Sequence, residues 1–365
     1  MLQRDRLAAI ERLRVEGEGV SLQAALDIPA GGPRRLRLAR AVLGTGTNAQ
    51  GEITWPRAEG QPWVVRLSGQ SLDLTGEMAR RDPVKPGEEQ RGPAWSAELQ
   101  LDRLVLGPGR IITGVRARSE NDGLITRIAR VTGRAGLGAF ELSILPSGLP
   151  RRRSLTITAQ DAGGLLAALD VTEQIRGGRL QVSGSYDDSR TDHLLSGTAE
   201  ITDFGVRDAP VVAKLLQAIT VVGALEAFSG PDLSFTRLVA PFAYRGDRID
   251  LVDARAFSAS LGLTIKGRVD MARKLFDLQG TVVPAYFLNS LLGRVPLIGK
   301  LVSPEAGGGL FAMNYVVTGG FDDPSVRVNP LSAVAPGFLR GIFEGMPGAG
   351  GPAAPTPGAR EGGQN

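Results

Sequence analysis

The stretch that decides the fold class is LGLTIKGRVD, which runs from Leu261 to Asp270. Its large apolar residues, Leu261, Leu263, Ile265 and Val269, are separated by small or polar residues. Successive side chains of a β-strand point to opposite faces of the sheet. The alternation therefore predicts a strand with one apolar face and one polar face.

The same alternation recurs along the chain, with Gly and Asp turns between the repeats. Further apolar positions of this kind are Leu155 and Ile157, Phe276 and Leu278, and Phe311, Met313, Tyr315 and Val317. We expect a mainly β fold: an elongated antiparallel sheet of roughly 14 or more strands, curled into a half-pipe, with a few short helices toward the C-terminus. The competing architecture is a compact pair of packed sheets.

Composition excludes several kinds of chemistry. The 365 residues include 49 Gly, 23 Pro, one His and no Cys, so disulfides, thiolate nucleophiles and Cys-based zinc sites are excluded. The formal net charge is +4, and basic clusters occur at 34–40 and 151–153. We interpret these clusters as solvated, and we expect no nucleic-acid partner because aromatic residues for base stacking are sparse.

The remaining segments are assigned as follows. We expect residues 81–94 to form an exposed loop, and helices are predicted at 162–169, 210–225, 285–292, 296–302 and 336–343. We expect the Gly/Pro-rich residues 344–365 to form a disordered tail. The chain starts without an export signal or a membrane span, so we expect it to be the C-terminal piece of a longer protein.

Motifs that would indicate catalysis are weak. The single His193 lies in a polar run with no partner nucleophile motif, and Gly293 to Lys300 lacks the spacing of a phosphate loop. Residues 133–138 predict a flexible hairpin turn, and the acidic pairs at 187–188 and 322–323 predict turns. We therefore expect no enzymatic activity, no cofactor and no metal site.

A set of motifs in the C-terminal half resembles the C-terminal region of the AsmA-like proteins of Gram-negative envelopes. The motifs are, in chain order, ITDFGVRDAP at 201–210, APFAY at 240–244, SLGLT at 260–264, GTVVPAY at 280–286, NSLL at 289–292, VPLIG at 295–299 and NPLSAVAPG at 329–337. The resemblance divides the chain into β-groove strands at 1–160, an AsmA-like region at 161–343 and the tail at 344–365.

The resemblance implies a repeating β-groove protein that moves phospholipid across the periplasm between the inner and outer membranes. The function it implies is a non-enzymatic, membrane-associated conduit in the cell envelope. We expect this chain to depart from the family pattern by lacking the N-terminal anchor. The alternative is a structural or assembly factor of the outer membrane that carries no lipid.

The residues expected to line the lipid groove are the inward positions of the C-terminal strands: Leu261, Leu263, Ile265, Val269, Phe276, Leu278, Phe311, Met313, Tyr315 and Val317. Apolar contacts are non-directional, so such a trough would shield acyl chains while letting them slide. The same apolar faces would also be expected if the two sides of the sheet packed into a filled core.

A second apolar group lies after this region: Leu288, Leu291, Leu292, Leu297, Ile298 and Leu301. We expect it to contact a membrane surface or an envelope protein at the end of the conduit. The alternative is that it plugs the open end of the sheet and protects the last edge strand.

Overall fold

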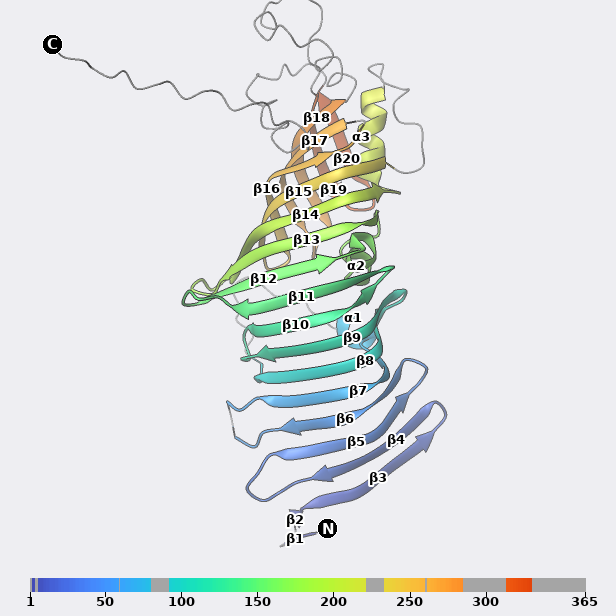
Figure 1. The fold of residues 1–365 in the computed structure, drawn as a ribbon, viewed down its shortest axis with the longest axis vertical. Coiled ribbons are helices and arrows are strands. Elements are labelled where there is room, and N and C mark those ends of the chain that lie inside the picture. The colour runs from blue at the N-terminus through green and yellow to red at the C-terminus, as the bar shows by residue number, and fades with distance from the viewer. Residues whose placement is uncertain are drawn as a thin grey trace, which may run out of the picture.

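The computed structural model describes residues 2–3, 6–58, 60–79, 92–220, 233–259, 261–284 and 313–329. It shows one long sheet of 18 strands and three short helices within these residues, which confirms the predicted fold class. Figure 1 shows the strands stacked along the long axis, from β3 near the N-terminus to β18–β20 at the other end.

The strands are β1 (Leu2–Gln3), β2 (Arg6–Leu7), β3 (Ala9–Gly17), β4 (Val20–Asp27), β5 (Arg34–Leu43), β6 (Thr47–Trp55), β7 (Trp63–Asp73), β8 (Trp95–Gly107), β9 (Arg110–Asn121), β10 (Thr126–Ala135), β11 (Gly138–Pro146), β12 (Arg152–Ala159), β13 (Ile175–Asp187), β14 (Leu194–Val206), β15 (Leu233–Arg245), β16 (Arg248–Phe257), β17 (Leu261–Asp270), β18 (Leu275–Pro284), β19 (Met313–Gly320) and β20 (Pro324–Asn329). The helices are α1 (Thr75–Ala79), α2 (Ala162–Ala168) and α3 (Pro210–Thr220).

From β3 to β20 each strand pairs with its neighbour in sequence, and every pairing is antiparallel except that of β7 with β8. The sheet is continuous across the predicted boundary at residue 160, because β12 pairs with β13 along its full length. Among the described strands none joins β20 to β3, so the sheet is open and has two edges.

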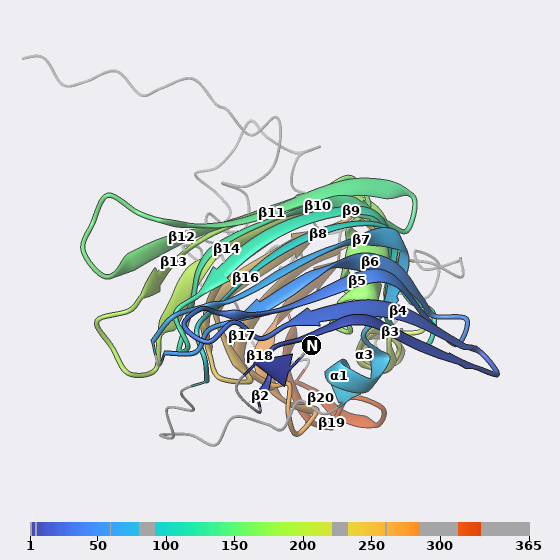
Figure 2. The ribbon, with the colours of Figure 1, turned by 90° about the horizontal axis from the view of Figure 1, so that it is seen from below.

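Seen along the long axis, the strands arch over a concave side, and the three helices lie on that side along one margin (Figure 2). Helix α2 matches its prediction: the Asp161 carboxylate accepts a hydrogen bond from Gly164 N at 2.9 Å, and Leu165 is buried. Helix α3 also begins at its predicted Pro210. The predicted helices at 285–292, 296–302 and 336–343 and the loop at 81–91 lie outside the described residues.

Glycine permits the close strand contacts that the curvature requires. At Gly267 φ is +125° and an added Cβ would lie 2.2 Å from Asp277 O, and at Gly51 φ is +148° with Arg66 O at 2.0 Å. Only a residue without a side chain fits these positions.

The extended sheet predicts a long distance between Gln50 on β6 and Lys266 on β17, both exposed on the outer face. With neighbouring strands about 4.8 Å apart, the two positions should lie about 50 Å apart along the sheet. The chain has no native Cys, so spin labels on Gln50→Cys and Lys266→Cys are unambiguous in double electron–electron resonance. A dominant distance below about 30 Å would indicate two packed sheets and contradict this fold.

Candidate functional site

The concave face carries an apolar row that crosses the whole sheet. Cross-strand register joins one residue from each strand into this row, here called row 1: Ile10, Leu26, Leu36, Ile53, Val65, Ala97, Ser119, Ala129, Ile144, Leu155, Gly184, Gly197, Phe242, Leu251, Gly267, Leu278, Val317 and Val326. Its single polar member is Ser119, whose hydroxyl donates to Ile128 O at 3.2 Å.

A second row lies two residues along the strands and is apolar throughout. Row 2 comprises Leu13, Ala24, Leu38, Gly51, Leu67, Leu99, Ala117, Val131, Leu142, Ile157, Val182, Ala199 and Ala240. It spans β3 to β15 and ends where the β15–β16 register shifts. Rows 1 and 2 run side by side from β3 to β15 and together form one apolar surface.

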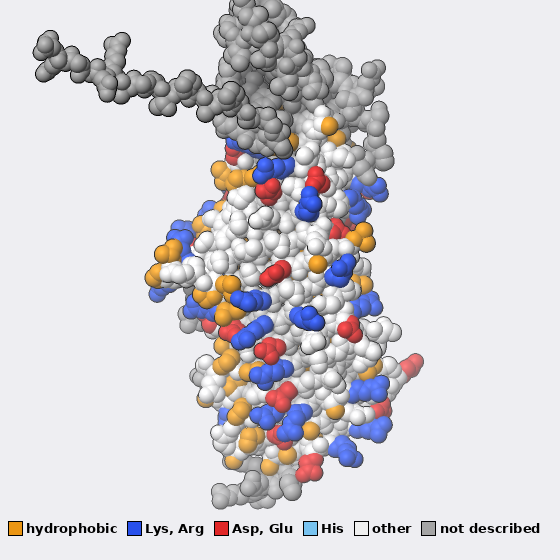
Figure 3. All heavy atoms as spheres, in the orientation of Figure 1, with side chains coloured by type: hydrophobic (Ala, Val, Ile, Leu, Met, Phe, Trp, Pro, Cys, Tyr) orange, Lys and Arg blue, Asp and Glu red, His pale blue; other side chains and the backbone are white. Residues whose placement is uncertain are grey.

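The convex face is polar, as Figure 3 shows by its interspersed basic and acidic side chains. Between rows 1 and 2, on the opposite face, the register aligns Arg37, Glu52, Arg66, Glu98, Arg118 and Arg130. The predicted solvation of the arginines at 34–40 is confirmed, since all three on β5 that face outward, together with Arg34, are exposed.

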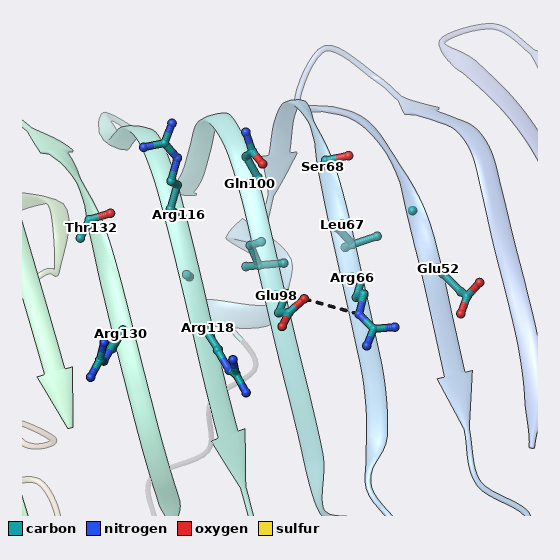
Figure 4. A pocket seen from close by; sticks show the side chains of 13 residues that line it. Glu52, Arg66, Leu67, Ser68, Glu98, Gln100, Arg116, Arg118, Arg130 and Thr132 are labelled. Carbon is teal, nitrogen blue, oxygen red and sulfur yellow. Dashed lines mark ion pairs between the residues drawn. The ribbon is translucent and has the colours of Figure 1, made fainter. Parts of the chain in front are cut away.

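Two shallow furrows cross the strands on this convex face. The first, of about 560 Å³, lies between the row containing Arg66 and Glu98 and the row containing Gln100 and Arg116 (Figure 4). Arg66 Nε lies 3.4 Å from Glu98 Oε2 in an exposed ion pair. The second furrow, of about 620 Å³, continues over β10–β14. Both are open. Six charged side chains line the first furrow, and three, Glu141, Arg179 and Glu200, line the second.

Burial along the concave face increases toward the C-terminal end. On β3–β7 the large side chains of row 1 are only half-buried. On β17–β19, by contrast, Leu261, Val282 and Val317 are at most 1% exposed and belong to one hydrophobic core. Filled core and accessible apolar surface therefore occur in the same sheet, at opposite ends.

The predicted lining residues fall at the filled end. Leu261, Leu263, Met313, Tyr315 and Val317 are buried, and Ile265, Val269, Phe276 and Leu278 are half-buried. All nine lie on the concave face, where register brings Leu263 beside Val282 and Met313 beyond it. Phe311 and the second apolar group, Leu288 to Leu301, lie outside the described residues.

The accessible stretch on β3–β7 was missed by the residue-level prediction. Its signal is present in the sequence, since Leu36 and Leu38 flank Arg37, and Val65 and Leu67 flank Arg66. The strands themselves were expected there, but which end of the sheet stays accessible depends on packing between distant strands.

An aromatic cluster borders this accessible stretch. Register places Trp63 next to Trp95, and the rings of Trp55 and Trp63 stack with centroids 5.9 Å apart. These are the three Trp residues of the chain. Each is two residues from a row 1 position on its own strand, so each faces the concave side, and Trp63 is 39% exposed. Sequence spacing alone did not indicate this cluster.

Tyr315 ties β19 to β17 across the intervening strand. Its hydroxyl donates to Thr264 O at 2.7 Å, and burial raises its pKa above the ordinary value. The ring lies over Gly280, where an added Cβ would approach the Tyr315 hydroxyl to 2.7 Å. The contact fixes the filled end of the sheet.

The solvated interpretation of residues 151–153 was wrong for Arg153, which is only 4% exposed. Its guanidinium donates to both carboxylate oxygens of Asp188, at 2.7 and 2.8 Å, and to Thr126 O at 2.5 Å. It also lies over the Tyr186 ring, 4.1 Å from the centroid. The reason is strand parity: Arg153 pairs with Tyr186 and so faces the concave side.

Asp188 is the charge partner that makes this burial tolerable. Burial acts to raise the pKa of its carboxyl, but the hydrogen bonds and charge of Arg153 outweigh that effect, so the pKa lies below its ordinary value. His193 lies beside the pair, with Nδ1 3.4 Å from Asp188 Oδ1. The acidic pair is thus part of a structural ion pair at the sheet margin.

In the other acidic pair, Asp323 accepts a hydrogen bond from Lys214 Nζ on helix α3 at 2.6 Å. Among the described residues no group of three or more His, Asp or Glu side chains is arranged to hold a metal ion. None of the helices in the described ranges is long and apolar enough to cross a membrane.

Comparison of the chain with protein-family models, with curated proteins and with solved structures found no match. The function must therefore be argued from the surface itself. Its chemistry is that of a long apolar strip on the concave face of the sheet.

The buried ion pair predicts a large difference between two neighbouring arginines. Arg153→Met leaves the Asp188 carboxylate buried without its partner and should lower the free energy of unfolding by about 3 kcal/mol. Arg152→Met removes only a 45%-exposed side chain, 3.7 Å from Asp187, and should cost less than about 1 kcal/mol. Urea denaturation measures both.

The contribution of Asp188 to stability should change with pH in a defined direction. Because the folded pKa of Asp188 is depressed, its stabilisation is present above the unfolded pKa of about 3.9 and is lost as pH falls through the folded value. The stability gap between wild type and Asp188→Asn should therefore shrink in acid. Equal costs for the two arginine variants, or a gap that grows in acid, would contradict this assignment.

Proposed function

We propose that the protein is a non-enzymatic phospholipid conduit whose concave face shields acyl chains from water. The observation that supports this most directly is row 1, which crosses all 18 strands of the sheet with Ser119 as its one polar member. At a strand spacing of about 4.8 Å, such a row extends for roughly 80 Å.

The energetics favour a continuous strip over a single pocket. A phospholipid with two long acyl chains has about 30 methylenes, each worth about 0.8 kcal/mol on transfer from water, so a hydrated intermediate would cost on the order of 20 kcal/mol. An unbroken apolar surface removes most of that cost at every position. Because the contacts are non-directional, no position along the accessible stretch of rows 1 and 2 on β3–β7 would trap the lipid.

The half-buried side chains of β3–β7 are the part of the surface best suited to take up acyl chains. Leu36, Ile53 and Val65 in row 1 and Leu38 and Leu67 in row 2 retain access to solvent. The Trp cluster at the margin of these strands supports the same role, because Trp rings favour the boundary between hydrocarbon and polar head groups.

The cellular setting belongs to the proposal as well. The AsmA-like motifs of the C-terminal half favour a place in the periplasm, between the two membranes of a Gram-negative envelope. The partners would then be phospholipid and a membrane surface or envelope protein at the C-terminal end. Two experiments distinguish this proposal from the alternative, a structural factor without lipid cargo.

The first experiment compares adjacent positions on opposite faces of β7. A photo-crosslinking amino acid in place of Val65, on the concave face, should capture phospholipid in cells. The same group in place of Arg66, whose side chain is 61% exposed on the convex face, should not. Mass spectrometry of the crosslinked protein identifies the lipid. Equal labelling at both positions, or none at Val65, would count against an acyl-chain surface.

The second experiment places a carboxylate in the path. Val65→Glu inserts a charge into row 1 and should slow phospholipid transfer between vesicles at least tenfold, because passing methylenes would meet a solvated charge. Val64→Glu is the matched control: Val64 pairs with Ser96 and faces the convex side. It should change the rate less than twofold. A structural factor would show no transfer by the wild type and no difference between these variants.

A further inference from the structure

The two edge strands of the sheet differ in how they are protected from pairing with another strand. The C-terminal edge strand β20 is short, begins with Pro324 and lies against α3, where Lys214 Nζ donates to Pro324 O at 2.7 Å. The N-terminal edge strand β3 has nine residues and contains neither Pro nor Lys. Short strands, Pro, covering helices, bulges and charged side chains are the usual protections of a sheet edge. In the described structure β3 has a register irregularity after Ile10 and four charged residues, but no Pro and no covering helix.

The exposed side of β3 also presents apolar side chains. All residues from Glu11 to Gly19 are exposed, including Leu13 at 36% and Val15 at 44% on the concave face. Row 2 ends at Leu13, and the adjacent apolar line through Leu22 ends at Val15. The apolar surface therefore stops at an unpaired strand rather than at a polar border.

The hairpin fixes which backbone groups of β3 are free. Gly17 and Val20 flank a two-residue turn, so they form a hydrogen-bonded pair, and Val15 with Leu22 forms the next one. The backbone N–H and C=O groups of Arg14 and Glu16 consequently point toward the free edge. These two residues are available to exchange hydrogen bonds with another strand.

Two opposite charges flank Val15 on β3: Arg14 precedes it and Glu16 follows it. If a second β3 is placed antiparallel with Val15 opposite Val15, each Arg14 faces a Glu16. The other two charges of β3, Glu11 and Arg12, would lie opposite the β3–β4 turn of the second copy. In this register Arg14 and Glu16 form the hydrogen-bonded pairs that the free backbone groups require.

We propose that β3 is the contact surface for a second copy of this chain, joined edge to edge around a two-fold axis at Val15. The axis is perpendicular to the sheet, so both concave faces lie on the same side. Val15 of one copy then meets Val15 of the other, and the apolar surface continues from one molecule into the next. The inference stands on the edge and its charges, and it does not depend on the lipid function.

The contact should be weak and salt-sensitive. A single strand pair buries little area, and its ion pairs are exposed: the side chains of Arg14 and Glu16 are 66% and 46% exposed in the single chain, where they lie 3.0 Å apart. Sedimentation equilibrium of the purified chain at low ionic strength should show reversible association from 38.5 kDa to twice that mass. High salt should shift it toward the monomer.

Charge reversal supplies a test that a folding defect cannot imitate. Arg14→Glu places two carboxylates opposite each other at each side of the axis, and Glu16→Arg places two guanidinium groups there, so each variant alone should be monomeric. Mixed together, the two variants should associate, because their edge strands are complementary to each other. The double variant Arg14→Glu/Glu16→Arg should dimerise like the wild type.

Three outcomes would overturn the proposal. They are a wild type that is monomeric at every concentration, single variants that dimerise as well as the wild type, and a mixture of the two single variants that stays monomeric. Lipid transfer need not be measured in any of these experiments, so the dimer and the conduit can fail separately.

Discussion

The architecture depends on strand register. A slip of one residue at any strand pairing would turn the apolar side chains of the following strands to the convex face. The pairings nevertheless keep one face apolar from Ile10 on β3 to Val326 on β20, through the irregular pairings at β3–β4, β5–β6 and β15–β16. Glycines such as Gly51 and Gly267 absorb the local distortion without changing the face. Register, more than any single contact, makes the concave surface continuous.

The two ends of the sheet differ in the burial of their concave-face side chains, because the strands approach one another differently at each end. Where β13–β20 curl inward, side chains such as Val282 and Val317 meet and exclude solvent. Where β3–β7 remain spread, equivalent side chains stay half-exposed. Arg153, the one buried cation among the described residues, is accommodated at the margin by Asp188 and Tyr186 rather than within the apolar rows. The charged side chain of Arg153 thus lies at the edge of the concave face, outside rows 1 and 2.

Alternation of apolar and polar residues was sufficient to predict the strands, their two faces and the elongated sheet, because a period of two is a local property. Pro210 likewise marked the start of α3, because Pro is favoured at the first position of a helix. The parallel pairing of β7 with β8, the gradient of burial and the Trp cluster depend on contacts between distant strands. Arg153 shows most clearly what sequence alone cannot predict. Because it lies beside Arg151 and Arg152, which are exposed, it was predicted to be solvated as well. Only the position of Asp188 in the fold shows that Arg153 is buried.

The central claim, that acyl chains lie along the concave face, is tested most directly by methyl NMR with a phospholipid that carries a nitroxide on its acyl chain. Methyl groups of Leu36, Ile53 and Val65 should be broadened strongly on binding. Those of Val64 and Val316, on the opposite face and with Val316 43% exposed, should be affected far less. Broadening confined to the convex face, or equal on both faces, would contradict the account.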